Sequence, residues 1–141
     1  MGEAYFLGLC AQFVECRQRE KLELLARVER HSVSGVVPLL AKYNLRPRRE
    51  SELSRLGAEH VLQYEDWSWM SLIKYMVKRY PLYLEDFAKL ESLAPLEDRA
   101  PLSFLTKHEV AAIDFAEREL AGISYSEQPL HAYLESEINI V

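Results

Sequence analysis

The chain has 141 residues, of which 49% are hydrophobic and 28% charged, and its formal net charge is −5. The length predicts a single globular domain over residues 1–141. The hydrophobic fraction excludes an intrinsically disordered chain, which would be more polar. The negative charge argues against general binding to nucleic acid or anionic lipid, because contacts with phosphates depend on basic side chains.

The distribution of apolar residues along the chain argues against further classes. The longest apolar run, residues 35–41, is far shorter than the roughly twenty residues that cross a bilayer, so we expect no membrane span. The N-terminal stretch contains Glu3 and lacks the basic residues that begin a secretory signal, which favours a cytoplasmic protein. Cys10 and Cys16 should point to different faces of one helix, so we expect neither a disulfide nor a metal pair.

Apolar residues recur at helical spacing along most of the chain, and prolines and glycines mark where segments end. The first helical region should bend where Ser34, Gly35 and Pro38 interrupt its pattern. We predict, in chain order, a helical region over residues 3–43, a turn over 44–49, helices over 51–79 and 82–94, a loop over 95–100, a helix over 101–120 and a last amphipathic helix over 129–137.

The ends of these helices follow from single residues. Ser51 is the expected N-cap of the second helix, which should stop before Pro81 because the residue preceding a proline is biased away from helix. Pro101 and Gly122 suit the start and the end of the later helix. Short connections favour antiparallel neighbours, so the predicted fold is an all-α antiparallel helical bundle with an additional C-terminal helix.

One connection is strongly basic. Arg46, Arg48 and Arg49 surround Pro47 in the turn that follows the first helical region. We interpret this cluster as a solvated turn between helices. A binding site for an anion or for a partner is the alternative.

Three glutamates fall on helix faces that should be apolar. On a wheel of about 100° per residue, Glu109 lies at the centre of the apolar stripe of its helix. The same construction places Glu65 amid the apolar residues of the second helix, and Glu29 about 40° from the centre of the stripe on the first. We therefore predict that Glu65 and Glu109 face inward and that Glu29 is at least half buried.

Inward carboxylates need an explanation, because an ionised carboxylate among apolar side chains is costly unless it is paired or bound to a cation. One explanation is that each glutamate pairs with a nearby donor. The other is a shared site. Glu29 and Glu65 are each fourteen residues from the nearer end of the hairpin turn, so an antiparallel arrangement would bring them to the same height. Glu109 would lie lower, with Tyr83 at a comparable depth.

Glutamates that project from facing helices into a bundle core occur in a known architecture. Over residues 22–122 the chain resembles the ferritin-like superfamily, and FLTKHEVAAIDFAERELAG, with Glu109 inward and His108 beside it, is similar to the last helix of that fold. The resemblance implies a site for Fe or Mn held by Glu29, Glu65, Glu109 and His108. The family's Glu-x-x-His pairs are absent, since the third residues after the three glutamates are Ser32, Ser68 and Ala112.

These residues lead to one preferred function and two alternatives. We predict an enzyme that acts on a small molecule through Glu65, Glu109, His108 and Tyr83, as a metal-dependent oxidase or hydroxylase or by acid–base chemistry. No nucleotide cofactor is expected, because the sequence has no phosphate loop or dinucleotide motif.

The alternatives assign the apolar and acidic residues to binding. In the first, the domain is a non-catalytic interaction module whose final helix docks onto a partner or, in a homodimer, onto a second copy through Leu130, Leu134 and Ile138. In the second, it is a metal-free small-molecule binding protein in which burial keeps one glutamate neutral.

Overall fold

The computed structural model describes residues 1–138, and the secondary structure of this part is entirely helical, which confirms the predicted all-α class. Its elements are α1 (Gly2–Cys10), α2 (Cys16–Lys42), α3 (Glu50–Leu62), α4 (Trp69–Leu93), the short 3₁₀ helix η1 (Leu96–Asp98), α5 (Arg99–Leu120) and α6 (Gln128–Glu135). None of these helices has the length and apolarity needed to cross a membrane.

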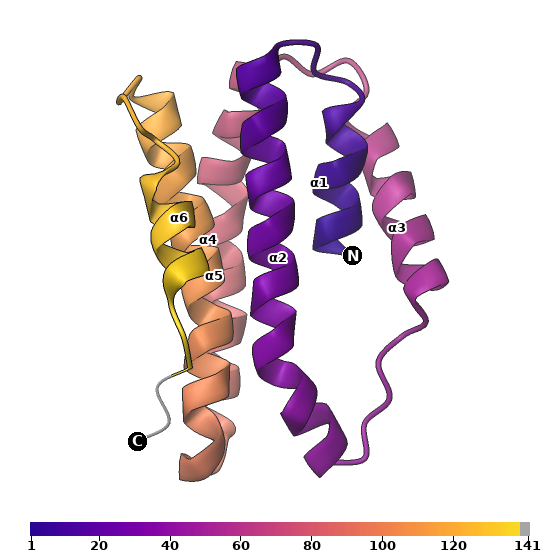
Figure 1. Ribbon diagram of the computed structural model, residues 1–141, viewed down its shortest axis with the longest axis vertical. Helices are drawn as coiled ribbons and strands as arrows, with labels where there is room; N and C mark the ends of the chain where they lie inside the picture. Colours follow the sequence, from indigo (N-terminus) through magenta and orange to yellow (C-terminus); the bar gives the residue numbers. More distant parts are fainter. Residues whose placement is uncertain (139–141) are drawn as a thin grey trace.

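The helices pack around the contact between α4 and α5, which η1 connects at the lower end of the molecule (Figure 1). The long helix α2 packs against α5, and the short helix α6 lies on α5 and α2. Helix α1 packs on the upper half of α2 and on α3, so the N-terminus lies at mid-height (Figure 1).

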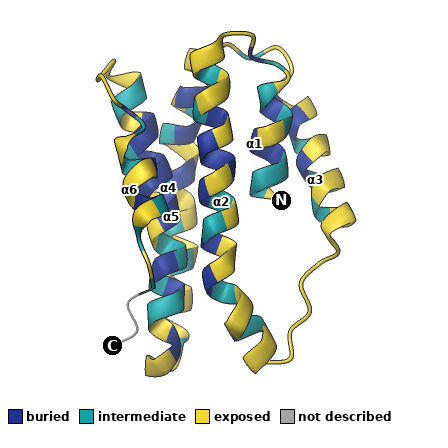
Figure 2. Cartoon of the chain, in the orientation of Figure 1, coloured by how far each residue is buried: buried dark blue, intermediate teal, exposed yellow. Residues whose placement is uncertain are grey.

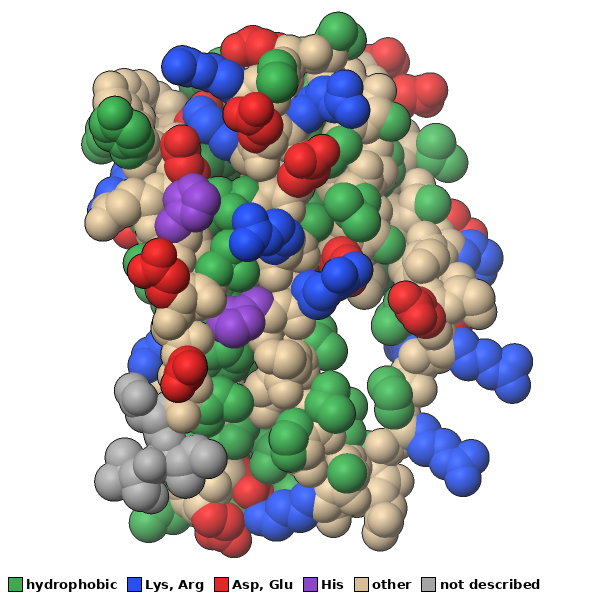
Figure 3. Space-filling view, in the orientation of Figure 1, with side chains coloured by type: hydrophobic (Ala, Val, Ile, Leu, Met, Phe, Trp, Pro, Cys, Tyr) green, Lys and Arg blue, Asp and Glu red, His purple; other side chains and the backbone are tan. Residues whose placement is uncertain are grey.

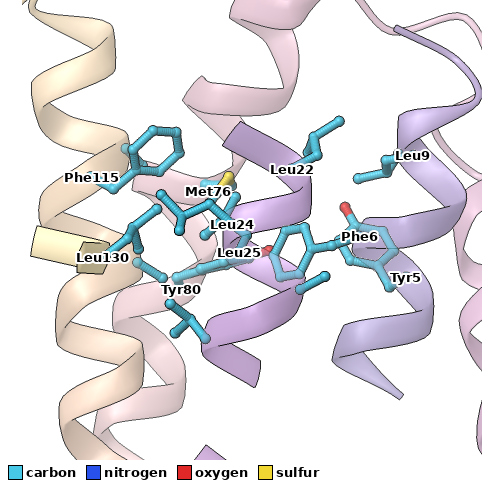
Figure 4. Packing of buried hydrophobic residues seen from close by; sticks show 14 of the residues in the cluster. Tyr5, Phe6, Leu9, Leu22, Leu24, Leu25, Met76, Tyr80, Phe115 and Leu130 are labelled. Atoms are coloured by element: carbon cyan, nitrogen blue, oxygen red, sulfur yellow. The ribbon is translucent and has the colours of Figure 1, made fainter. Parts of the chain in front are cut away.

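The core lies where α1, α2, α4 and α5 meet, and Figure 2 shows buried residues on each of these helices. Figure 4 shows Tyr80 of α4 lying beside Leu25 of α2 within this cluster. The largest fully buried apolar side chains are Phe6, Leu9, Leu22, Leu25, Val28, Leu72, Ile73, Met76, Phe115 and Leu130. Burial of such side chains contributes about 1.5–3 kcal/mol each to folding.

Helices α1 and α3 approach closely at two glycines. A Cβ placed on Gly57 would come within 2.7 Å of the Ala4 Cβ, and one placed on Gly8 would come within 2.8 Å of Val61 Cγ2. Real Cβ atoms do not make such short contacts, so the close approach of these helices depends on glycine at both positions.

The first predicted helical region is divided at a place where the sequence predicts no break. It breaks at residues 11–15, whereas α2 continues through Ser34, Gly35 and Pro38 to Lys42. The break inserts Phe13 into the core, where its ring meets the Trp69 ring edge-on at 5.4 Å. Tertiary burial therefore places the turn, since glycine and proline are absent from residues 11–15.

The second predicted helix, residues 51–79, is divided between α3 and α4. The Ser68 side chain caps α4 by accepting a hydrogen bond of 3.2 Å from the Ser71 backbone amide, and the Tyr64 and Trp67 rings pack together before it. Helix α4 then continues through Pro81 to Leu93, so the predicted break before Pro81 is wrong and the predicted helix 82–94 is the second half of α4. Packing against α5 offsets the hydrogen bond that the proline cannot donate.

The later part of the chain agrees better with the sequence pattern. Helix α5 ends at the predicted residue, Leu120, and Gly122 follows it with φ of 69°, in the left-handed region that glycine adopts readily. Helix α6 spans Gln128–Glu135, where a helix over residues 129–137 is predicted.

Candidate functional site

Glu109 lies inside the molecule, as predicted from its place in the apolar stripe of α5. It is 6% exposed, and within residues 1–138 no group hydrogen-bonds its Oε1 atom. A buried carboxyl oxygen without a partner is rare in folded proteins, because its lost hydration is not replaced. Glu109 is therefore the first candidate for a functional group.

His108 precedes Glu109 on α5 and is also buried, at 5% exposure. Its Nδ1 atom lies in hydrogen-bonding contact with the Leu105 carbonyl oxygen, which can only accept, so Nδ1 carries a proton. The Nε2 atom faces two carboxylates, with 3.6 Å to Glu29 Oε1 and 3.6 Å to Glu109 Oε2. These distances exceed that of a hydrogen bond but allow strong electrostatic coupling.

Glu29 brings α2 to this cluster. Its side chain is 24% exposed, so it connects the buried pair with solvent, as the prediction of a half-buried position implies. A Cβ added to Gly2 would overlap the Glu29 carboxyl group, so the first turn of α1 lies directly against this carboxyl, which would have to move if Gly2 were replaced. The cluster of Glu29, His108 and Glu109 thus depends on α1, α2 and α5 together.

Aromatic side chains surround the cluster. The Phe87 ring meets the His108 ring edge-on at 5.7 Å, and Tyr133 of α6 lies 6.4 Å from it between ring centres. Burial raises the pKa of Tyr80 far above its usual range, and the nearby Tyr5, Glu29 and Glu109 raise it further. Tyr80 is therefore a neutral phenol beside the cluster.

Burial and the charges of neighbouring groups shift the pKa values of Glu109 and His108. Burial raises the pKa of Glu109 to about 7; the charge of Glu29 adds to this shift, and His108 opposes it. Burial alone would lower the pKa of His108, but Glu29, the Leu105 carbonyl and Glu109 outweigh it, so the pKa of His108 lies above its usual value. Near neutral pH, Glu109 is therefore poised between its acid and its carboxylate form, beside a histidine whose pKa is raised above its usual value.

A second inward carboxylate, that of Glu119, differs from Glu109 because it is fully paired with hydrogen-bond donors. It accepts hydrogen bonds from Lys21 Nζ at 2.7 Å, Trp69 Nε1 at 2.9 Å and Ser126 Oγ at 2.5 Å. Burial raises its pKa, but these three donors outweigh burial and hold the pKa of Glu119 below its usual value. Glu119 is thus explained as a structural link, whereas Glu109 is not.

Two of the predicted site residues lie elsewhere. Glu65 is exposed in the turn between α3 and α4, so the prediction that it faces inward and opposes Glu29 is wrong. The helical wheel failed because α3 ends at Leu62, before this residue. Tyr83 is 42% exposed on α4, where its ring centre lies 6.0 Å from that of Tyr80.

The structure places Tyr80 where the sequence suggested Tyr83. Tyr80 follows Met76 by four residues and Ile73 by seven, so it continues the apolar stripe of α4. The spacing alone therefore predicts that Tyr80 faces the core. The prediction that the helix ends before Pro81 places Tyr80 at a helix end and so does not use this spacing. The role of Gly2 could not be read from the sequence, because it depends on where α1 meets Glu29.

Within residues 1–138, no group of three or more His, Cys, Asp or Glu side chains has an arrangement suited to holding a metal ion. No protein family, curated protein or solved structure was found to match this chain. The geometry of the cluster is therefore the main guide to function.

Proposed function

We propose that the protein is a small-molecule enzyme that works by proton transfer at Glu29, His108 and Glu109. The observation that carries this proposal is the buried Glu109 carboxyl, whose Oε1 atom has no partner within residues 1–138. With a pKa of about 7, this group can both donate and accept a proton near neutral pH. A buried carboxyl oxygen without a hydrogen-bond partner lowers the stability of the folded protein, and a catalytic role accounts for its presence.

Each residue has a distinct role in this proposal. Glu109 exchanges a proton with the substrate through its free oxygen. His108, held in one orientation by the Leu105 carbonyl, carries charge on the opposite side of the carboxyl group. Glu29, which reaches solvent, stabilises the protonated imidazole and returns the proton to water.

The surroundings of Glu109 indicate the class of substrate. The cluster is enclosed by Phe87, Tyr80 and apolar core residues, and Glu109 offers one free oxygen. Such a site fits a small, mostly apolar molecule with one carbonyl, hydroxyl or amine group to align with that oxygen. An anionic substrate is disfavoured, because the carboxyl groups of Glu29 and Glu109 both lie 3.6 Å from His108 Nε2 and would repel an anion.

A metal-dependent form of the same enzyme is the second candidate. Carboxylates from two long helices converge on one histidine, an arrangement in keeping with the resemblance to ferritin-like bundles. Fe or Mn would take ligands from Glu29, Glu109 and His108, which would first have to move closer together. Elemental analysis after incubation with Fe²⁺ and with Mn²⁺, in wild type and Glu109→Ala, tests this form directly.

Proton transfer can be tested without knowing the substrate. Small ketones, aldehydes and α-amino compounds are incubated in D₂O with the protein, and incorporation of deuterium at carbon is followed by NMR. We expect the wild type and the exposed-site control Glu65→Gln to catalyse exchange in at least one compound, and Glu109→Gln to lose most of that rate. Equal exchange rates with wild type and Glu109→Gln, or no exchange in any compound, would contradict the proposal.

A further inference from the structure

The lower half of the molecule lacks the cover that α1 gives to the upper half. Arg30 of α2 forms an ion pair of 2.5 Å with Glu3 in the first turn of α1. Val33 and Val37 follow Arg30 by three and seven residues, so they continue the same face of α2 toward its C-terminal end. Both valines are about half exposed, whereas the equivalent face higher up is covered by α1.

An apolar groove opens in this lower half. It has a volume of about 410 Å³ and lies between the end of α2, the end of α4 and the start of α5. Its walls include Leu40, Leu90 and Leu105, and among residues 1–138 Asp98 is the one charged residue that lines it. Apolar side chains also gather on the visible face of this half in Figure 3.

The rim of the groove exposes large apolar side chains. Leu45 and Leu93 line the groove yet are 58% and 75% exposed, and Leu96 of η1 is 78% exposed. Single exposed leucines are ordinary on a protein surface. A set of them around an apolar groove is typical of a surface that binds another molecule.

Opposite charges lie on the two sides of the groove. The connection after α2, at the lower right of Figure 1, carries Arg46, Arg48 and Arg49, all exposed and in none of the ion pairs within residues 1–138. On the other side, the end of α4 and η1 carry the exposed acids Glu85, Asp86 and Glu97. Glu97 lies 3.7 Å from Lys42 of the same chain, and the exposed cations of this segment are Lys89 and Arg99. The surface is therefore apolar in the middle, basic on one side and more acidic than basic on the other.

We propose that a second copy of this chain covers the groove, in a two-fold symmetric dimer. A two-fold axis through the groove turns the basic side of one copy onto the acidic side of the other, so both charged contacts are made twice. The leucines at the rim, Leu45, Leu93 and Leu96, would then be buried against each other. This dimer uses the lower surface and leaves the proposed catalytic cluster within each chain unchanged.

The oligomeric state over a range of concentrations tests the proposal. Sedimentation equilibrium should show a reversible dimer for the wild type, with Leu93→Glu raising the dissociation constant at least about tenfold. Leu93 is exposed, so this variant should fold, and circular dichroism checks it. Ile123→Glu, an equally drastic change at an exposed residue after α5, is the control and should leave the dimer intact.

Charge reversal gives an independent check. One variant carries Arg46→Glu, Arg48→Glu and Arg49→Glu, and another carries Glu85→Lys, Asp86→Lys and Glu97→Lys. Each alone should dimerise poorly, whereas an equal mixture should form a mixed dimer, because both charged contacts are then complementary again. A wild type that stays monomeric, a dimer equally sensitive to Ile123→Glu, or variants that fail to pair when mixed would each overturn the proposal.

Discussion

The imidazole of His108 faces the carboxylate of Glu29 across the contact between α5 and α2, with 3.6 Å between Nε2 and Oε1. The two residues are 79 positions apart in the sequence. Their coupling raises the pKa of His108 despite its burial, because the nearby negative charge favours the imidazolium form. A partly exposed residue in one helix thus helps to raise the pKa of a buried residue in another, against the effect of burial.

The stability of the protein should fall as the pH rises from 5 to 8. Glu109 has a pKa of about 7 when folded against 4.5 as a free side chain, so the folded state binds more protons in this interval. The shift corresponds to about 3 kcal/mol of unfolding free energy, lost progressively and gone above pH 7. The raised pKa of His108 acts in the same direction, since its contribution is present at low pH and lost as the imidazole deprotonates.

Urea unfolding at four pH values checks this expectation. Glu109→Gln cannot ionise, so its stability should depend less on pH and should exceed that of the wild type by about 2–3 kcal/mol at pH 8. Some dependence should remain from His108. A wild type whose stability is the same at pH 5 and pH 8 would show that Glu109 is not held near its neutral form.

Replacement of Gly2, which lies outside the cluster of Glu29, His108 and Glu109, should change the pKa of His108. In Gly2→Ala the new methyl group overlaps the Glu29 carboxyl, which must move, and the pKa of His108 should fall toward its usual value. NMR titration of the His108 ring protons measures this shift. Gly122→Ala is the matched control: its strained φ of 69° costs about 1 kcal/mol, but a Cβ there has no neighbour within 4 Å. An unchanged His108 titration in Gly2→Ala would place Glu29 away from the imidazole.

Loss of the Glu119 carboxylate should be strongly destabilising. Glu119→Ala leaves the Lys21 ammonium, the Trp69 indole and the Ser126 hydroxyl without their shared acceptor, which we expect to cost about 3 kcal/mol. Chemical unfolding followed by tryptophan fluorescence measures the change. Lys21→Met removes one donor and keeps the other two bonds, so it should cost clearly less. Equal losses of unfolding free energy in the two variants would show that the ion pair between Lys21 and Glu119 supplies the stabilisation, and that the bonds from Trp69 and Ser126 add little.

Helix α6 should contribute to the core and not to a free docking surface. Leu130 is fully buried within the same chain, and Leu134 and Ile138 pack partly against the core, which contradicts the expectation that this face is free for a partner. Leu130→Ala should therefore lower the unfolding free energy by about 2–5 kcal/mol. Leu62→Ala, at a residue 66% exposed on α3, should stay within about 0.5 kcal/mol of wild type. A similarly small effect of Leu130→Ala would mean that α6 is detached in solution.

The sequence predicted the later helices better than the earlier ones, for a physical reason. Local signals define α5: an apolar stripe at helical spacing precedes Gly122, whose φ of 69° suits glycine. No glycine or proline ends a helix at residues 11–15 or 63–68, and Ser68 is a local signal only for the start of α4. The breaks there arise because Phe13 and Tyr64 are buried in the assembled fold, and such contacts are invisible in a single segment.

The candidate site shows the same division. The inward position of Glu109 follows from periodicity within one helix, and it is confirmed by its burial. The opposition of Glu29 to His108 requires the relative placement of two helices, which the chain pattern does not contain. Glu65 was misplaced because its inward position rested on a continuous helix that ends three residues earlier.

The close approach of α1 and α3 at Gly8 and Gly57 has a consequence for the order in which the molecule opens. The main packing partner of α3 is α1, so α3 has little to hold it once α1 moves. Deuterium should therefore enter the backbone amides of α3 sooner than those of α5, which other helices surround. Joint opening of α1 and α3 would also move Gly2 away from Glu29. Such local opening would admit water to the buried carboxyl of Glu109 while the rest of the chain stays folded.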